Sequence, residues 1–230
     1  MSRNILIAFC GFKRSGKDSC AESIKTVLEN DFKYAVNVEK LTIESFACHL
    51  KAIIKEIFGI DEAEVEDKEK KIPFTKKYLG EEYSYRELMI KIGDGIRELV
   101  NQNVWTFAKE NKLHKLAKSV KNGDNVFIIP DVRYRSEIKL LKKMRKNGWE
   151  VYFYPVFRKE TMPDWVKMGM DPNVQWERNI IEDDFSTEYC EYEVMMCNPK
   201  ITDYIVNDGT LKDLDNEVME KIIKKIWKEK

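Results

Sequence analysis

Histidine and long apolar runs are both scarce in this chain of 230 residues. Its two histidines, His49 and His114, leave little material for histidine-based metal sites or catalytic triads. The N-terminal apolar run Ile5–Phe9 is flanked by polar residues and is too short for a membrane span or for the core of a signal peptide. We therefore expect a soluble protein of the cytoplasm (the host cytoplasm if the source is a virus), with no membrane partner.

The cysteines do not form a pattern that binds metal or builds a disulfide scaffold. There are five of them, an odd number, with no CxxC pair and no histidine at ligand spacing. Disulfide frameworks and zinc sites need paired or clustered ligands, so neither is expected. We expect reduced thiols in the core at Cys10, Cys20, Cys48, Cys190 and Cys197.

Neither sign of charge is in excess. The 40 basic side chains balance 40 acidic ones, so the sequence carries no electrostatic footprint for general nucleic-acid binding, although a local basic cleft stays open. An apolar content of 43% argues against intrinsic disorder. No repeat and no Gly/Ser-rich or Pro-rich linker marks a boundary, so we expect a single domain over residues 1–230.

Apolar runs alternate with helical patterns along the chain. Strong strand signals lie at Asn4–Phe9, Val126–Ile129 and Glu150–Phe157, and weaker ones at Val36–Leu41 and Thr202–Val206. Helices are expected over Ser19–Glu29, Cys48–Phe58, Tyr85–Gln102, Val104–Lys121, Ser136–Asn147 and Leu211–Lys228. This alternation predicts βαβ crossovers and hence a three-layer α/β/α fold around a central parallel sheet of about five strands.

Two segments fit the alternation poorly. Asp61–Lys77 is dense in Glu and Lys, and Thr161–Met196 mixes tryptophan, methionine and acidic residues without a clear period. We expect both to be insertions over the sheet, with a solvated charged face as the simpler reading of the first. The second is a candidate lid over about residues 158–196, because long connections often close over active sites.

The stretch Gly11–Ser19 has the GxxxxGK spacing of a phosphate-binding loop (P-loop), and it lies between a predicted strand and a predicted helix. Gly11 and Gly16 permit a tight turn whose backbone amides converge on an anion, and the helix N-terminus adds partial positive charge. Lys17 would reach the terminal phosphates. The pattern predicts binding of a polyphosphate, and phosphoryl transfer is a chemistry that such a loop supports.

The residue after the lysine departs from the usual motif. Asp18 stands where a Ser or Thr hydroxyl normally binds magnesium, and Ser19 follows one position later. A carboxylate beside a triphosphate is repulsive unless it faces a cation or a network of donors. Its role is therefore open between the magnesium shell and support of the loop.

Lys13 and Arg14 place two cations inside the loop. Neither is needed to form the turn, and cations near a transferring phosphoryl group can stabilise its developing charge. We expect one to face the donor and one the acceptor, with a solvated charge pair as the alternative.

The loop Lys13–Asp18 resembles that of the bacteriophage-type deoxynucleoside monophosphate kinases, in which the aspartate belongs to the pattern. Phe46–Lys51 looks like the FAxPLK segment of that family, with His49 in place of proline. Tyr85–Met89 followed by Gly93 looks like its acceptor-side helix. The resemblance spans nearly the whole chain, but only the loop is specific by itself.

Three later segments continue the resemblance in the same order. Trp105 matches an aromatic residue after that helix, Asp131–Arg133 with Glu137 looks like a DxR…E segment, and Asn207–Leu211 resembles an NDGTL turn. The GT(D/E)xxR stretch of the family is here Gly93–Arg97, without its threonine, so the register of Arg97 is uncertain by one residue.

The resemblance implies a P-loop kinase that uses ATP and Mg²⁺ to convert deoxynucleoside monophosphates to diphosphates, with a helical acceptor-binding insertion over about residues 42–121. The ATP contacts it implies are Gly11, Arg14, Ser15, Gly16, Lys17, Asp18, Ser19, Asn207, Asp208 and Gly209. The acceptor contacts are Lys13, Leu50, Lys51, Arg86, Arg97, Trp105, Arg133 and Glu137. The catalytic set is Lys13, Lys17, Asp131, Arg133 and Arg158, and the candidate magnesium ligands are Asp18, Ser19 and Asp131.

Several of these roles have simpler alternatives. Asp131 follows a buried strand, at the edge where open α/β sheets bind ligands, but it could instead cap the helix near Ser136. Arg86 could grip a monophosphate with two parallel hydrogen bonds or pair with an exposed residue one turn away. Arg178, in the lid, competes with Arg158 as an arginine supplied in cis.

The turn Asn207–Gly209 lies near the donor purine in the resembling family, and its alternative is a plain glycine turn before the last helix. Two other functions stay open. A kinase of the phosphomevalonate type has a similar loop and a non-nucleotide acceptor, and a nucleotide-binding switch or ATPase would need no acceptor. A homodimer is compatible with the sequence, but no exposed apolar stripe points to an interface.

Overall fold

The structure, a computed structural model, describes residues 2–30, 38–119, 122–161 and 201–227. The chain divides into two compact units, one formed by residues 1–45 together with 112–230 and the other by residues 46–111. We call them the sheet unit and the helical unit. Residues 162–196 of the predicted lid, with Arg178 among them, lie outside the described residues.

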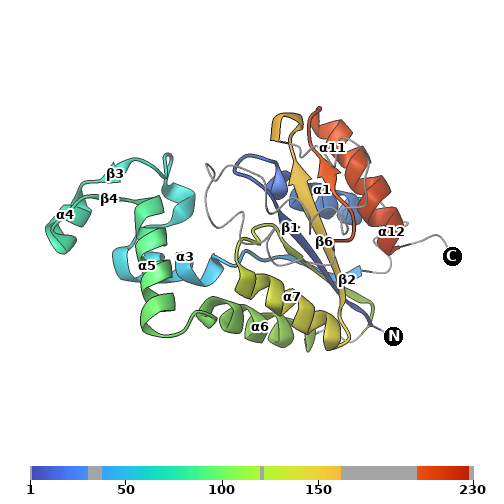
Figure 1. Ribbon diagram of the computed structural model, residues 1–230, viewed down its shortest axis with the longest axis horizontal. Helices are drawn as coiled ribbons and strands as arrows, with labels where there is room; N and C mark the ends of the chain where they lie inside the picture. Colours follow the sequence, from blue (N-terminus) through green and yellow to red (C-terminus); the bar gives the residue numbers. More distant parts are fainter. Residues whose placement is uncertain (1, 31–37, 120–121, 162–200, 228–230) are drawn as a thin grey trace, which may run out of the picture. The chain divides into compact units, whose positions relative to one another are not determined.

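The sheet unit is built on five parallel strands (Figure 1). They lie in the order β2-β5-β1-β6-β7, so β1 is central and the chain moves first to one side of it and then to the other. The strands are β1 (Asn4–Cys10), β2 (Val38–Ile43), β5 (Asp124–Ile129), β6 (Glu150–Phe157) and β7 (Ile205–Val206). The expected fold class, an α/β fold with a central parallel sheet of about five strands flanked by helices, is confirmed.

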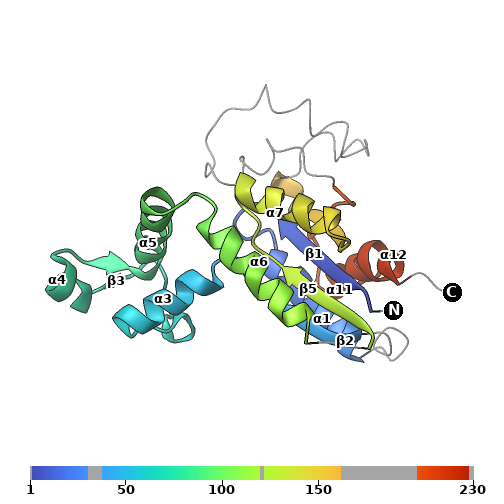
Figure 2. The ribbon, with the colours of Figure 1, turned by 90° about the horizontal axis from the view of Figure 1, so that it is seen from below.

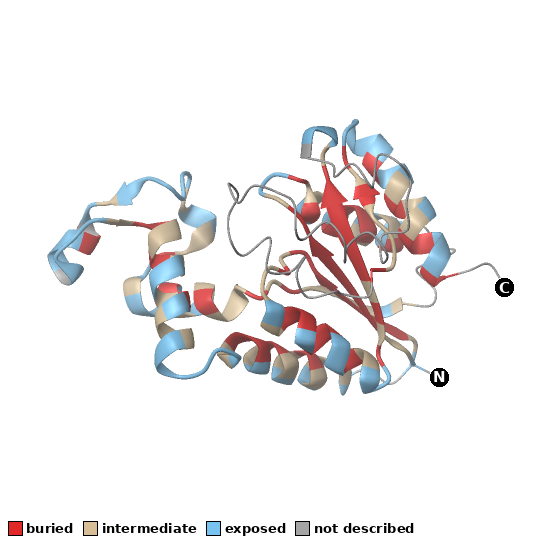
Figure 3. Ribbon diagram, in the orientation of Figure 1, coloured by how far each residue is buried: buried red, intermediate tan, exposed pale blue. Residues whose placement is uncertain are grey.

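Helices cover the sheet because its central strands are apolar on both faces. Ile5, Ile7 and Phe9 of β1 pack in one cluster with α1 and the C-terminal helices. Figure 2 shows α7 on the other side of the sheet from α1, and Figure 3 shows the central strands buried. The covering helices are α1 (Lys17–Asn30), α7 (Arg135–Lys146), α11 (Leu211–Val218), a π-helical turn (Met219–Ile223) and α12 (Lys224–Ile226). A short 3₁₀ turn, η2 (Lys159–Thr161), follows β6.

The helical unit has a core of its own, which contains Leu50, Ile54, Tyr85, Leu88 and Trp105. The segment Asp61–Lys77, expected to be a charged insertion over the sheet, forms part of this unit, and its residues Lys71–Ile72 pair antiparallel with Tyr83–Ser84. The elements are α3 (Cys48–Phe58), η1 (Glu62–Glu64), β3 (Lys71–Ile72), α4 (Phe74–Leu79), β4 (Tyr83–Ser84), α5 (Tyr85–Leu99) and the first turns of α6 (Val104–Ala117).

The structure corrects several expected boundaries. Only Ile205 and Val206 of the run Thr202–Val206 join the sheet, and the last helix contains the π turn. Within that turn the carbonyl oxygen of Lys221 accepts a hydrogen bond of 3.2 Å from the buried Tyr154 hydroxyl. Cys10 and Cys20 are buried as expected, whereas Cys48 is half-buried and its Sγ accepts a hydrogen bond of 3.1 Å from Lys109 Nζ. Cys190 and Cys197 lie outside the described residues. Among the described residues, no helix combines the length and the apolar character needed to cross a membrane.

Glu87 caps the N-terminus of α5, and its hydrogen bonds make the stability of the fold depend on pH. Its carboxylate accepts hydrogen bonds from Lys71 Nζ (2.5 and 2.6 Å) and from the Ser84 backbone amide (2.7 Å), which together lower the pKa of Glu87 to about 2. Because a lowered pKa stabilises the fold only where the unfolded carboxyl is ionised, we expect Glu87→Gln to lower the melting temperature at pH 7. The difference should shrink as the pH falls from about 4.5 towards 2. Thermal unfolding of both proteins across this range checks the prediction, and a difference that grows on acidification would contradict it.

Candidate functional site

The phosphate-binding loop connects β1 to α1 and is held close to two other strand ends. Gly11 has φ 142°, and a Cβ added there would lie 2.3 Å from the Val156 carbonyl oxygen of β6. Gly16 has φ 98°, and its Cβ would lie 1.8 Å from the side-chain nitrogen of Asn207, after β7. Both positions therefore require glycine, for backbone conformation and for space.

The interior of the loop is polar. Lys17 is 8% exposed, and its Nζ donates to the carbonyl oxygens of Gly11 (2.5 Å) and Phe12 (2.8 Å). The Ser15 amide donates to the Phe12 carbonyl oxygen over 3.1 Å. The Ser15 hydroxyl is buried, and among the described residues it has no hydrogen-bond partner. A buried donor without a partner costs about 1–3 kcal/mol, so the loop interior suits a ligand that accepts hydrogen bonds.

The outer side of the loop carries its charged side chains. Lys13, Arg14 and Asp18 are exposed, and Ser19 is half-buried. Arg14 has φ 65°, the only positive φ outside glycine among the described residues. Backbone conformations of this kind are unfavourable for a residue with a Cβ and occur often at functional sites.

The ends of β6 and β7 hold the loop from the side. Arg158 Nε donates to the Arg14 carbonyl oxygen over 3.4 Å, and the Asn207 side-chain amide donates to the Ser15 carbonyl oxygen over 3.0 Å. The structure thus brings Arg158 and Asn207 to the loop, because both follow parallel strands that end at the same edge of the sheet. Asn207 supports the backbone of the loop.

The other two residues of the predicted turn lie beside local partners. Asp208 Oδ1 accepts from the Lys159 amide over 3.4 Å. A Cβ at Gly209 would meet the Asp213 carboxylate, 2.5 Å away, which caps α11 through Thr210. The alternative of a glycine turn that starts the last helix therefore describes Gly209 well.

Asp131 follows β5 at the same edge of the sheet. Its Oδ2 accepts a hydrogen bond of 2.9 Å from the Ser45 hydroxyl, after β2. The alternative that Asp131 caps α7 is wrong, because Glu137 does this. The Glu137 carboxylate accepts from the amides of Arg133 (2.6 Å) and Tyr134 (3.0 Å).

Glu137 is 3% exposed, and its carboxylate holds the backbone that presents Arg133. Its expected contact with the acceptor stays a prediction.

Two residues at the carboxyl edge of the sheet, Glu44 and Ser45, were not predicted from the sequence. Glu44 and Ser45 directly follow β2. Glu44 is 8% exposed, and its carboxylate pairs with Lys112 Nζ over 2.8 Å. The usable signal was their position, since the carboxyl ends of all parallel strands meet at one edge. The apolar pattern of β2 is weak, so the sequence predicted its end at Leu41, whereas the strand ends at Ile43.

The remaining acceptor candidates lie in the helical unit. Leu50 and Trp105 belong to the core of this unit, and the Trp105 indole donates to the Gly93 carbonyl oxygen over 3.1 Å. Their expected contacts with the acceptor stay predictions. Arg97 pairs with Asp94 (2.7 Å), and Arg86 lies 3.6 Å from Glu69, a partner in another segment and not one turn away on its own helix.

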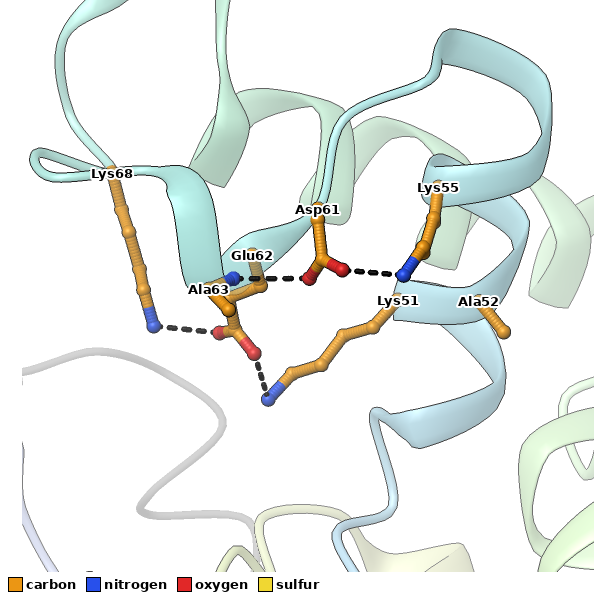
Figure 4. A pocket seen from close by; sticks show the side chains of 7 residues that line it. All are labelled: Lys51, Ala52, Lys55, Asp61, Glu62, Ala63 and Lys68. Carbon is orange, nitrogen blue, oxygen red and sulfur yellow. Dashed lines mark hydrogen bonds and ion pairs between the residues drawn. The ribbon is translucent and has the colours of Figure 1, made fainter.

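A pocket of about 450 Å³ opens on the same unit (Figure 4). Three of its lining side chains are lysines and two are carboxylates, and Lys51, an expected acceptor contact, is one of them. The lining residues are Lys51, Ala52, Lys55, Asp61, Glu62, Ala63 and Lys68.

The Cys20 thiol beside the loop is not activated as a nucleophile. Burial raises the pKa of the Cys20 thiol, next to the loop on α1, to about 12, so this thiol stays protonated at neutral pH. Among the described residues, no three His, Cys, Asp or Glu side chains cluster as a metal site. Mg²⁺ commonly uses only one or two protein carboxylates together with substrate phosphates, and the oxygen donors of Asp18, Ser19 and Asp131 suit such a hard cation.

Comparisons with known proteins assign this chain to no family. No protein-family model matches the chain, and no curated protein matches it. Among solved structures, the Mycobacterium tuberculosis APS kinase CysC in complex with AMPPNP and APS is 12% identical, covers 97% of this chain and 99% of its own, and has a TM-score of 0.41. Chaetomium thermophilum Kti12 in complex with ADP-AlF3 is 14% identical, covers 94% and 98%, and has a TM-score of 0.38. Similarity at this level identifies neither a substrate nor a reaction.

The contact between Gly16 and Asn207 can be tested by substitution. Gly16→Ala introduces both an unfavourable φ, at a cost of about 1–2 kcal/mol, and a clash with the Asn207 amide. We expect ATP affinity to fall at least tenfold, measured by calorimetric titration. Gly148→Ala is the matched control, because Gly148 has φ 84° but nothing within 4 Å of an added Cβ. If both variants bound ATP as the wild type does, the loop would not depend on this close approach.

Proposed function

We propose that this protein is an ATP-dependent kinase that phosphorylates deoxynucleoside monophosphates to diphosphates. The observation that carries the proposal is the loop Gly11–Lys17 at the carboxyl edge of a parallel sheet. Inside it lie a buried lysine and the buried Ser15 hydroxyl, which has no hydrogen-bond partner within the described part of the chain. The resemblance of the loop and of the later segments to deoxynucleoside monophosphate kinases supports the choice of acceptor.

The donor triphosphate would lie along the loop and the start of α1. Backbone amides at a helix N-terminus bind anions, and α1 begins at Lys17. Lys17 would exchange its bonds to the Gly11 and Phe12 carbonyl oxygens for bonds to phosphate oxygens. The Asn207 side-chain amide holds the Ser15 carbonyl oxygen, so the loop would be preorganised before ATP binds.

The transferring phosphoryl group develops charge on its equatorial oxygens, and nearby cations stabilise that charge. Arg158 lies against the loop, and Lys13 and Arg133 belong to the same unit. Asp131, held by Ser45, would orient the acceptor or hold the metal through water. Mg²⁺, where bound by Asp18, Ser19 or Asp131, would neutralise phosphate charge.

Acceptor recognition would rest on cations of the helical unit. Arg86, Arg97 and Lys51 each lie beside one carboxylate, and an arginine can bind a phosphate through two parallel hydrogen bonds. An acceptor monophosphate is already anionic, so no strong general base is needed. The helical unit therefore supplies positioning more than proton transfer.

A panel of acceptors tests the proposal. We expect ADP release from ATP to depend on dGMP, dTMP or dCMP and to be absent with phosphomevalonate, in a coupled assay with Mg²⁺. Turnover with phosphomevalonate alone would identify a non-nucleotide kinase. ATP hydrolysis that proceeds equally without any acceptor would instead identify a switch or ATPase.

Lys17→Ala tests the role of the loop lysine. We expect the rate of phosphoryl transfer to fall about 10²-fold or more, because the terminal phosphates lose a preorganised cation. Circular dichroism should show the same helix content. Lys25→Ala, on the exposed side of the same helix near Glu22, should keep wild-type activity. Activity of Lys17→Ala within about threefold of the wild type would refute the assigned role.

A further inference from the structure

The pocket of the helical unit carries more cations than anions. Lys51 and Lys55 lie one turn apart on α3, and Lys68 faces them from the loop before β3. With Asp61 and Glu62, the lining has three positive and two negative groups and thus one net positive charge. A pocket of this composition favours an anionic ligand.

Glu62 lies between two of these lysines. Its Oε2 is 2.7 Å from Lys51 Nζ, and its Oε1 is 2.6 Å from Lys68 Nζ, so one carboxylate bridges two ammonium groups (Figure 4). Burial raises the pKa of Glu62, but the hydrogen bonds from Lys51 and Lys68 outweigh this effect and lower it overall. The space between Lys51 and Lys68 is therefore suited to an anion, and the Glu62 carboxylate occupies it.

Lys55 is held separately. Its Nζ pairs with Asp61 Oδ2 at 2.5 Å, and Asp61 also accepts from the Ala63 amide and so caps the turn η1. Asp61 thus has a structural task in the turn, whereas both carboxylate oxygens of Glu62 are used on lysines that face the pocket.

The bridge can exchange for a ligand at low cost. Side chains of Glu62, Lys51 and Lys68 are 25%, 33% and 54% exposed, and ion pairs with this much solvent contact contribute little to stability. Glu62 also lies in a helical turn of only three residues. A phosphate monoester carries about −1.5 to −2 charges and three acceptor oxygens, so two lysines bind it better than they bind a carboxylate.

We propose that Glu62 is an internal competitor for the phosphate group of the acceptor. Its carboxylate holds Lys51 and Lys68 until a phosphate monoester displaces it. The proposal rests on the proposed function, because the acceptor is the monoester that the pocket would take. Glu62 then raises the acceptor KM and selects dianionic phosphates against singly charged ligands, without a part in the transfer step.

Glu62→Gln tests this, because it preserves the shape of the side chain and removes its charge. We expect dGMP, titrated calorimetrically without ATP, to bind three- to tenfold more tightly, and the acceptor KM to fall by the same factor at unchanged kcat. Glu64→Gln is the matched control, since Glu64 is an exposed carboxylate of the same turn. The double variant Glu62→Gln with Lys51→Met should lose the gain, which places the effect in this pocket.

The outcomes separate this inference from the proposed function. If the wild type phosphorylates dGMP but Glu62→Gln lowers only the melting temperature, Glu62 is a structural ion pair and the inference is wrong. To test the pocket without an active kinase, inorganic phosphate is titrated into the Lys17→Ala background. Tighter binding by Glu62→Gln than by Glu64→Gln in that background supports the inference even if no deoxynucleoside monophosphate is phosphorylated.

Discussion

The close approach of the phosphate-binding loop to two neighbouring strand ends is the constraint on which the site depends. Gly11 lies against the Val156 carbonyl oxygen, and Gly16 lies against the Asn207 amide, at separations that leave no room for a Cβ. The loop is therefore shaped by residues up to 192 positions away in the chain. A binding site whose backbone is already in place loses less conformational freedom when its ligand binds.

The parallel sheet explains why these residues meet. Every strand of the sheet ends at the same edge, so Ser45, Asp131, Arg158 and Asn207 each follow a strand and come together around the end of β1. Because β1 is central and the chain crosses from one side of it to the other, the loop lies where open α/β sheets bind ligands. The same logic brings Ser45 to Asp131, a contact between two segments that share no sequence motif.

Charge in the helical unit is arranged as pairs. Lys51, Arg86 and Arg97 lie beside Glu62, Glu69 and Asp94, which agrees with a chain whose basic and acidic side chains balance. An anion that bound to one of these cations would have to displace its carboxylate. A carboxylate that bridges two lysines, as Glu62 does, would then affect the affinity more than an exposed neighbour.

Local patterns in the sequence determined the five strands of the parallel sheet, most helices and the phosphate-binding loop. The run Glu150–Phe157 was predicted with the observed bounds, because a strand buried on both faces is continuously apolar. The sequence could not separate a ligand contact from a core or capping residue. Leu50 and Trp105 are buried in the helical unit, and Glu137 caps its own helix, since burial and hydrogen-bond partners depend on contacts between distant segments. Only the tertiary structure decided that Asn207 supports the loop and that Glu62 bridges two lysines, because both arrangements join residues that no local pattern relates.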